Sequence, residues 1–223
     1  MVIKATLAAS VIAAAAMASS ASAETVSLHF DSVSAGWTQV HIDTTPVGPT
    51  GSVTATGLNM TSTSSLGNFV AWCLDLGHTI SVGSTHSYDT TTTPFSETTG
   101  LLGDALAHVQ SVFDANFGSV DFTNAGQAAG FQVALWNVLY DGDWDAGAGL
   151  FAVGDGSVRT QANDYLLAAY NFTGDSNWNL TFLESNDGSQ NLVTASAVPL
   201  PAAGLLLLAA LGGLGLARRR KTV

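Results

Sequence analysis

The feature that most constrains this chain is the near absence of basic side chains from its middle. Residues 24–197 hold all 17 acidic residues and a single basic one, Arg159, for a formal net charge of 1 − 17 = −16. Because one basic residue allows almost no ion pairs, the stability of the fold has to come from apolar burial and hydrogen bonds. The same charge repels phosphate backbones, argues against nucleic-acid binding and invites divalent cations.

Both ends of the chain differ from this acidic domain and predict targeting segments. Residues 1–23 contain Lys4, an apolar run and a final Ala-Ser-Ala, the pattern of a secretory signal peptide cleaved after Ala23. No residue is charged between Val198 and Ala217, and a basic cluster follows, namely Arg218, Arg219, Arg220 and Lys221. An apolar run of about 20 residues is just long enough to span a membrane, with its basic end in the cytoplasm. We therefore expect residues 24–197 to form one exported domain, held first at the inner membrane.

The C-terminal segment, residues 198–223, resembles the PEP-CTERM sorting signals of Gram-negative bacteria, in the variant with a VPLPA motif. The matching motif residues are Val198, Pro199, Leu200, Pro201 and Ala202, and the apolar span and basic cluster follow in the same order. The resemblance implies recognition by an exosortase, which removes the tail and releases or anchors the exported domain. It also implies an association with exopolysaccharide and biofilm matrix. An ordinary single-span anchor is the alternative, but it leaves the motif unexplained.

The pattern of the exported domain predicts strands, then helices, then strands. Residues rich in Val, Thr and aromatics predict strands over 25–30, 36–42, 52–60, 68–76, 78–82, 178–184 and 190–196. Residues 83–100 predict a polar loop with one strand near Tyr88. Helical periodicity predicts helices between Thr99 and Gly118, over about 124–140 with Thr123 as cap, and over about 158–171 with Ser157 as cap. This order predicts an α+β fold, a β-sandwich or barrel-like sheet with a helical insertion.

Two residues are unusual for the apolar faces on which they fall. Gln132 lies near the middle of the apolar face of an amphipathic helix pattern, where an unbonded amide costs a few kcal/mol. Cys73 is the only cysteine, so it has no internal disulfide partner, and it lies in an apolar predicted strand. If the two side chains meet, the thiol can displace ammonia from the amide and leave an internal thioester. An incoming amine then opens the thioester and forms a covalent amide bond.

The surroundings of both residues resemble the motifs of the thioester domains of bacterial surface adhesins. Those domains pair an aromatic-Cys-hydrophobic-Asp motif with Thr-Gln-x-Ala-Ile-Trp, and the matching segments here are Trp72-Cys73-Leu74-Asp75 and Gln132-Val133-Ala134-Leu135-Trp136. The chain departs from the second motif at Leu135, a mild change, and at Phe131, which replaces a threonine hydroxyl. The alternative is therefore a domain that keeps the fold and lacks the bond.

The resemblance assigns a role to each residue of the site. It implies that Cys73 forms the thioester and later leaves, and that Gln132 supplies the acyl group. Trp72, Phe131 and Trp136 are expected to shield the bond from water. Asp75 is expected to orient the site or assist proton transfer, or else to be a plain surface aspartate.

Other candidate chemistry is weaker. Asp141, Asp143 and Asp145 begin like a calcium loop, but Ala146 and Ala152 replace the turn glycine and the bidentate glutamate. A looser calcium site and a simple acidic loop both stay open. The exported domain contains no G-x-S-x-G, HExxH or phosphate-binding glycine loop, and a Cys73–His78 pair is the remaining hydrolase arrangement. We therefore expect no enzyme and no other cofactor.

Two functions remain open from the sequence. The first is covalent attachment through the thioester to an amine on a surface or matrix component. The second is a non-covalent, acidic structural protein of the biofilm or exopolysaccharide matrix. In that case Cys73 is a buried free thiol, Gln132 bonds backbone groups, and Trp37, Trp144 and Trp178 contact polysaccharide. The mass of the mature chain distinguishes the two, because a thioester makes it lighter by one ammonia.

Overall fold

A computed structural model of the protein describes residues 24–92, 101–154 and 156–199. The predicted signal peptide (1–23), the proposed cap Thr99 and the tail from Leu200 through the basic cluster lie outside the described residues. Val198 and Pro199, the first two residues of the sorting motif, are described, and the Val198 N–H donates to the Asn177 carbonyl at 2.9 Å. Within the described ranges, no helix is both long and apolar enough to cross a membrane.

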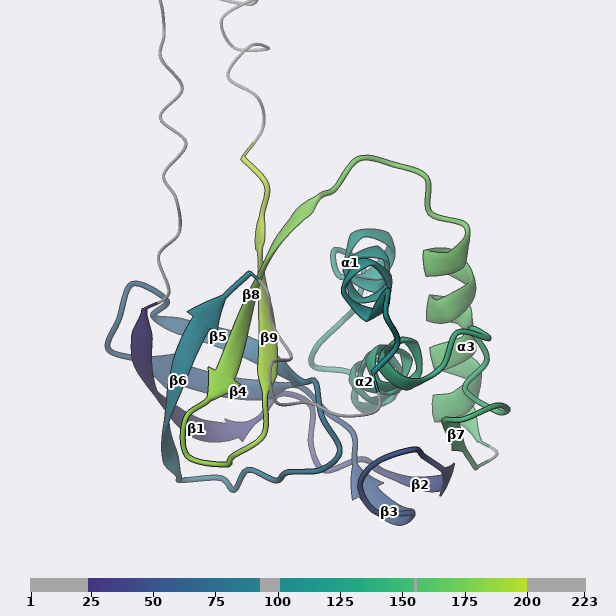
Figure 1. Ribbon diagram of the computed structural model, residues 1–223, viewed down its shortest axis with the longest axis horizontal. Helices are drawn as coiled ribbons and strands as arrows, with labels where there is room; N and C mark the ends of the chain where they lie inside the picture. The colour runs from purple at the N-terminus through teal and green to yellow at the C-terminus, as the bar shows by residue number, and fades with distance from the viewer. Residues whose placement is uncertain (1–23, 93–100, 155, 200–223) are drawn as a thin grey trace, which may run out of the picture.

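Six antiparallel strands close into a barrel (Figure 1). Around the barrel the order is β1 (Thr25–Val33), β4 (Leu58–Ser62), β5 (Asn68–Cys73), β9 (Leu192–Ala197), β8 (Trp178–Ser185) and β6 (Thr85–Thr91). Alternate residues of β1, namely Val26, Leu28 and Phe30, are buried, because successive side chains of a strand point to opposite faces. The barrel-like alternative of the sequence prediction is confirmed.

Several strand predictions were wrong in their detail. Residues 52–60 divide into β3 (Gly51–Thr54) and β4, and β3 pairs with β2 (Gln39–Thr44) in a second sheet that β7 (Ala152–Val153) completes. Residues 78–82 form no strand, because the Asp75 side chain accepts the His78 N–H at 2.8 Å and turns the backbone there. The strand predicted near Tyr88 is confirmed as β6, which buries Tyr88 between β1 and β8.

Three helices form an insertion between β6 and β8. They are α1 (Ala105–Asn116), α2 (Ala125–Tyr140) and α3 (Ser157–Tyr170), and Figure 1 shows α1 and α2 lying between the barrel and α3. The cap of α2 is Asn124 rather than Thr123, since the Asn124 side chain accepts the Gln127 N–H at 3.1 Å. The cap of α3 is Gly156, which makes no side-chain cap bond, so the prediction of Ser157 as cap was also wrong.

The amphipathic interpretation of α2 was wrong because other elements cover this helix on all sides. Every residue from Ala128 to Tyr140 is buried. At Gly130 a Cβ would lie 2.6 Å from the Gln161 side chain, so glycine allows α3 to pack directly on α2. Because α2 is buried between the barrel and α3, Gln132 lies at the end of β5 with no access to solvent.

Candidate thioester site

The carboxamide of Gln132 is bound to the backbone of Cys73. Its Oε1 accepts the Cys73 N–H at 2.9 Å, and its Nε2 donates to the Cys73 carbonyl at 2.8 Å. The pairing of β4 with β5 ends at Ala71, so β4 does not reach Cys73, which among the described strands pairs only with Leu192 of β9 on the other side of the strand. Gln132 satisfies the two backbone groups that β4 leaves open, and this explains how a fully buried amide is tolerated on α2.

The thiol of Cys73 has a different partner, which the sequence did not indicate. Cys73 is a free, buried cysteine, and its Sγ donates to Oε1 of Gln190 at 2.9 Å. The Gln190 Nε2 in turn donates to the Asp75 carbonyl at 2.6 Å. The Gln132 side chain thus meets the backbone of Cys73 but not its thiol, and forming a bond between the two side chains requires the thiol to turn from Gln190 toward the Gln132 acyl carbon.

Asp75 organises the segment that follows β5. Its side chain is buried, so the interpretation as a surface aspartate was wrong. One carboxylate oxygen accepts the Asn191 N–H at 2.7 Å, and the other lies 3.2 Å from Nδ1 of His78. These bonds hold the residues after Cys73 against the start of β9. His78 is thus the partner of Asp75, and no described contact joins it to the Cys73 thiol.

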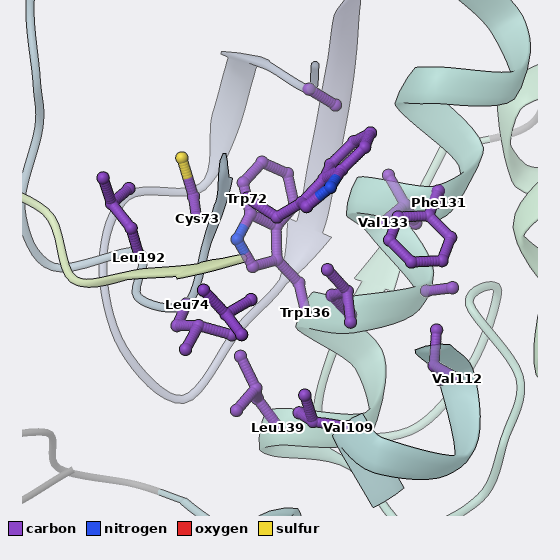
Figure 2. Packing of buried hydrophobic residues seen from close by; sticks show 14 of the residues in the cluster. Trp72, Cys73, Leu74, Val109, Val112, Phe131, Val133, Trp136, Leu139 and Leu192 are labelled. Carbon is purple, nitrogen blue, oxygen red and sulfur yellow. The ribbon is translucent and has the colours of Figure 1, made fainter. Parts of the chain in front are cut away.

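The three aromatic residues expected to shield the site lie on two sides of β5. Figure 2 shows the Trp72 side chain directed toward Phe131, on the opposite side of the strand from the Cys73 sulfur. The Trp72 and Phe131 ring centroids lie 4.8 Å apart, and Phe131 also packs edge-on against Phe113 at 5.2 Å. Trp136 instead extends from α2 toward Cys73 (Figure 2). Trp136 therefore covers the site itself, whereas Trp72 and Phe131 belong to the core behind it.

Burial changes the ionisation of the groups around the thiol. Burial raises the pKa of Cys73 above its ordinary value of 9.0, and the Asp75 carboxylate adds to the rise. Burial also raises the pKa of Tyr88 and of Tyr140, whose ordinary value is 10.0. The Tyr88 hydroxyl donates to the Gln190 carbonyl at 3.1 Å, and the Tyr140 hydroxyl accepts the Leu76 N–H at 3.2 Å. All three groups are therefore neutral in the folded protein at neutral pH.

We predict that alkaline pH destabilises the fold. Above pH 9.0 for a thiol, and above pH 10.0 for the two tyrosines, the unfolded chain loses protons that the folded chain keeps. Stability is complete below these values and falls as pH rises through them, because the unfolded state then binds fewer protons. Urea unfolding between pH 7 and pH 11 measures the slope. The Tyr140→Phe variant should lose less stability over this range, and an equal loss would contradict the assignment.

The three aspartates of the candidate calcium loop are occupied by the loop itself. Asp141 accepts the N–H groups of Asp143 at 3.2 Å and Phe151 at 3.1 Å, and Asp143 accepts that of Asp145 at 3.0 Å. Asp145 accepts the Gly147 N–H at 2.8 Å. In the part of the chain that the structure describes, no group of three His, Cys, Asp or Glu residues is arranged to hold a metal ion. The structure favours the acidic-loop alternative.

Calcium should therefore have no specific effect on stability. We predict the same melting temperature in calcium and in a chelator at matched ionic strength. A melting temperature that rises steadily with calcium concentration would instead show a site that binds only the folded state.

No protein-family model and no curated protein matches the sequence. Solved structures of similar fold include the N-terminal domain of the Streptococcus pyogenes pilus tip adhesin Cpa, at 17% identity and a TM-score of 0.48, covering 82% of this chain and 97% of that one. The N-terminal thioester domain of the fibronectin-binding protein SfbI from Streptococcus pyogenes has 15% identity and a TM-score of 0.42, with 77% and 98% covered. The Bacillus anthracis TIE protein has 8% identity and a TM-score of 0.39, with 79% and 40% covered.

The tryptophans proposed to contact polysaccharide differ in their exposure and packing. Trp37 is 63% exposed. Trp144 packs against His108 and Tyr170, with ring centroids 4.7 and 5.7 Å away, and Trp178 packs on Phe117 at 4.8 Å. Nothing in their placement favours an aromatic platform for a sugar chain.

Proposed function

We propose that this protein is an exported surface or matrix protein that attaches covalently to amines through a Cys73–Gln132 thioester. One observation carries the proposal: a fully buried glutamine amide on α2 is bonded to both backbone groups of the only cysteine, 59 positions away in the chain. The signal peptide and the sorting signal of residues 198–223 supply export and processing by an exosortase. The inner membrane holds the precursor until the tail is removed.

The proposed bond forms in one balanced step. The Cys73 sulfur adds to the Gln132 acyl carbon, the carbon–nitrogen bond breaks, and the thiol proton leaves with the amide nitrogen as ammonia. The Cys73 N–H that already contacts Gln132 Oε1 stabilises the negative charge on that oxygen during the addition. Because burial keeps Cys73 a neutral thiol, the step depends on the backbone contact that holds Gln132 beside Cys73, and on a turn of the thiol away from Gln190, rather than on a reactive thiolate.

Burial of the site protects the thioester from water until an amine reaches it. Cys73 is 6% exposed and Gln132 is fully buried, so water has little access and hydrolysis of the thioester is slow. An amine that reaches the acyl carbon displaces the sulfur, which regains a proton as a thiol. The product is an amide bond between Gln132 and the target.

Incorporation of a labelled primary amine tests this function. We expect the native wild-type protein to take up one label per chain at Gln132. Cys73→Ser should take up none, because its hydroxyl does not form the thioester. The matched control Ser189→Ala changes a nearby buried hydroxyl and should leave uptake intact. Equal labelling of wild type and Cys73→Ser would contradict the proposal and favour the non-covalent matrix function.

A further inference from the structure

A groove of about 350 Å³ lies beside the candidate site. Its wall is mainly apolar, with His78 as the titratable side chain among its lining residues, and includes Trp37, Val53, His78, Ile80, Trp136 and Gln190. Trp37 is mostly exposed, whereas Trp136 and Gln190 are buried, so the groove leads from the surface toward the interior.

The buried end of the groove lies against Gln190, the hydrogen-bond partner of the Cys73 sulfur. Gln190 lines the groove, and the same Gln190 carboxamide accepts the Cys73 thiol at 2.9 Å. Only one side chain therefore separates the groove from the sulfur. The position of Gln190 is fixed by its bond to the Asp75 carbonyl and by the Tyr88 hydroxyl, which donates to the Gln190 carbonyl.

The same end of the groove contains a buried hydrogen-bond donor that has no acceptor in the described part of the chain. The indole N–H of Trp136 is buried and has no hydrogen-bond partner among the described residues. A buried donor without an acceptor costs about 1–3 kcal/mol, so its retention calls for an explanation. Trp136 lies one helical turn after Gln132, on the same face of α2, and Figure 2 shows the nitrogen-bearing edge of its ring turned toward Cys73.

We propose that this groove is the entrance for the attacking amine, and that the Trp136 N–H donates to the acyl oxygen of Gln132 as the amine adds. This inference rests on the proposed function. It adds the path by which the amine enters and a second hydrogen-bond donor to the acyl oxygen. The Cys73 N–H is the first donor, since it already bonds that oxygen at 2.9 Å. Two donors on one developing oxyanion stabilise the transition state in a site that excludes water.

The groove fits a lysine side chain on a partner protein. The apolar wall matches the methylene stem of lysine, whose charged end seeks polar groups such as the Gln190 carboxamide. The net charge of −16 on residues 24–197 attracts a basic partner and repels acidic ones. The attacking nitrogen forms a bond to the Gln132 acyl carbon, the carbon–sulfur bond breaks, and the proton lost by the nitrogen ends on sulfur. The thiol then returns to Gln190.

A bulky substitution at an exposed residue of the groove tests whether the groove is the entrance. Thr79 is exposed and lines the groove, so Thr79→Trp narrows the groove without disturbing the core, and Thr173→Trp at another exposed site is the matched control. The first rate measured is methylamine uptake by the native protein. The second is alkylation by iodoacetamide of the free Cys73 thiol in the folded protein, after methylamine treatment. We expect Thr79→Trp to slow both rates at least about tenfold and Thr173→Trp to change neither.

The donor is tested with a matched pair of tryptophans. Trp72 is also buried with an unpartnered indole N–H, but its ring is directed toward Phe131. Trp136→Phe should slow methylamine uptake about a hundredfold, whereas Trp72→Phe, which removes the same group from the other side of β5, should leave it within about threefold. Thermal unfolding confirms that both variants are folded.

Each result has a separate consequence. Equal slowing by Trp136→Phe and Trp72→Phe would overturn the donor role, because loss of packing would then explain both. Equal alkylation rates in Thr79→Trp and Thr173→Trp would overturn the entrance. If the wild-type mass shows no loss of ammonia, the proposed function and the donor role both fail. In that case the alkylation rates still test whether the groove leads to Cys73, because alkylation requires only a free thiol.

Discussion

The Gln132→Ala variant is expected to lose about 3–5 kcal/mol of unfolding free energy. The substitution leaves the N–H and the carbonyl of Cys73 without partners inside the protein and opens a cavity beside α2. Where the thioester is present, the Gln132 nitrogen has already left as ammonia, so the variant there loses the contact to the Cys73 N–H and a crosslink between residues 59 positions apart. Urea unfolding at neutral pH measures the change.

Gln127→Ala is the matched control for this prediction. Gln127 lies on the same helix and its side-chain oxygen accepts the Asp121 N–H, but this bond is exposed to solvent. We expect its removal to cost less than about 1 kcal/mol. If the two variants were equally stable, the amide of Gln132 would not be holding the end of β5.

Phe131→Thr is expected to lose about 3–5 kcal/mol, although threonine is the residue found at this position in the motif that the chain resembles. The Phe131 ring is fully buried, with Trp72 at 4.8 Å, Phe113 at 5.2 Å and Tyr165 at 6.1 Å between ring centroids. Threonine would leave a cavity there. Urea unfolding again gives the magnitude.

The half-buried Phe172 provides the control, and Phe172→Thr should cost about 1–2 kcal/mol. Because the Phe131 ring points away from the thiol, Phe131→Thr should not increase amine uptake by the fraction that stays folded. An increase would show that a hydroxyl at this position acts on the amide and that the aromatic contacts are secondary.

The sequence predicted the central pair because both residues break the pattern of their own element. A glutamine on an apolar helix face and a lone cysteine in an apolar strand are visible without any structure, and both are buried as expected. The sequence could not show which atoms meet. The direction of the thiol depends on Gln190, a polar residue at the start of a predicted strand, whose carboxamide bonds the Asp75 carbonyl only in the folded chain.

The strand β6 was predicted near Tyr88, but the sequence could not show its bounds. Most side chains of β6 are Thr, Ser, His or Asp, and Tyr88 is its one buried residue, so the apolar alternation that marks a strand is nearly absent. Barrel closure between β1 and β8 gives this polar segment its backbone partners. The amphipathic interpretation of α2 failed because tertiary packing buries positions that the sequence pattern assigned to solvent.

The intact mass of the mature protein, measured under denaturing conditions without any added nucleophile, tests the central claim most directly. We predict a chain lighter by one ammonia than its processed sequence, with Cys73 unreactive toward thiol reagents. Methylamine should then add its full mass and release a thiol. A mass equal to that of the unmodified chain, with Cys73 alkylated as soon as the protein unfolds, would contradict the thioester and leave Gln132 as a structural amide.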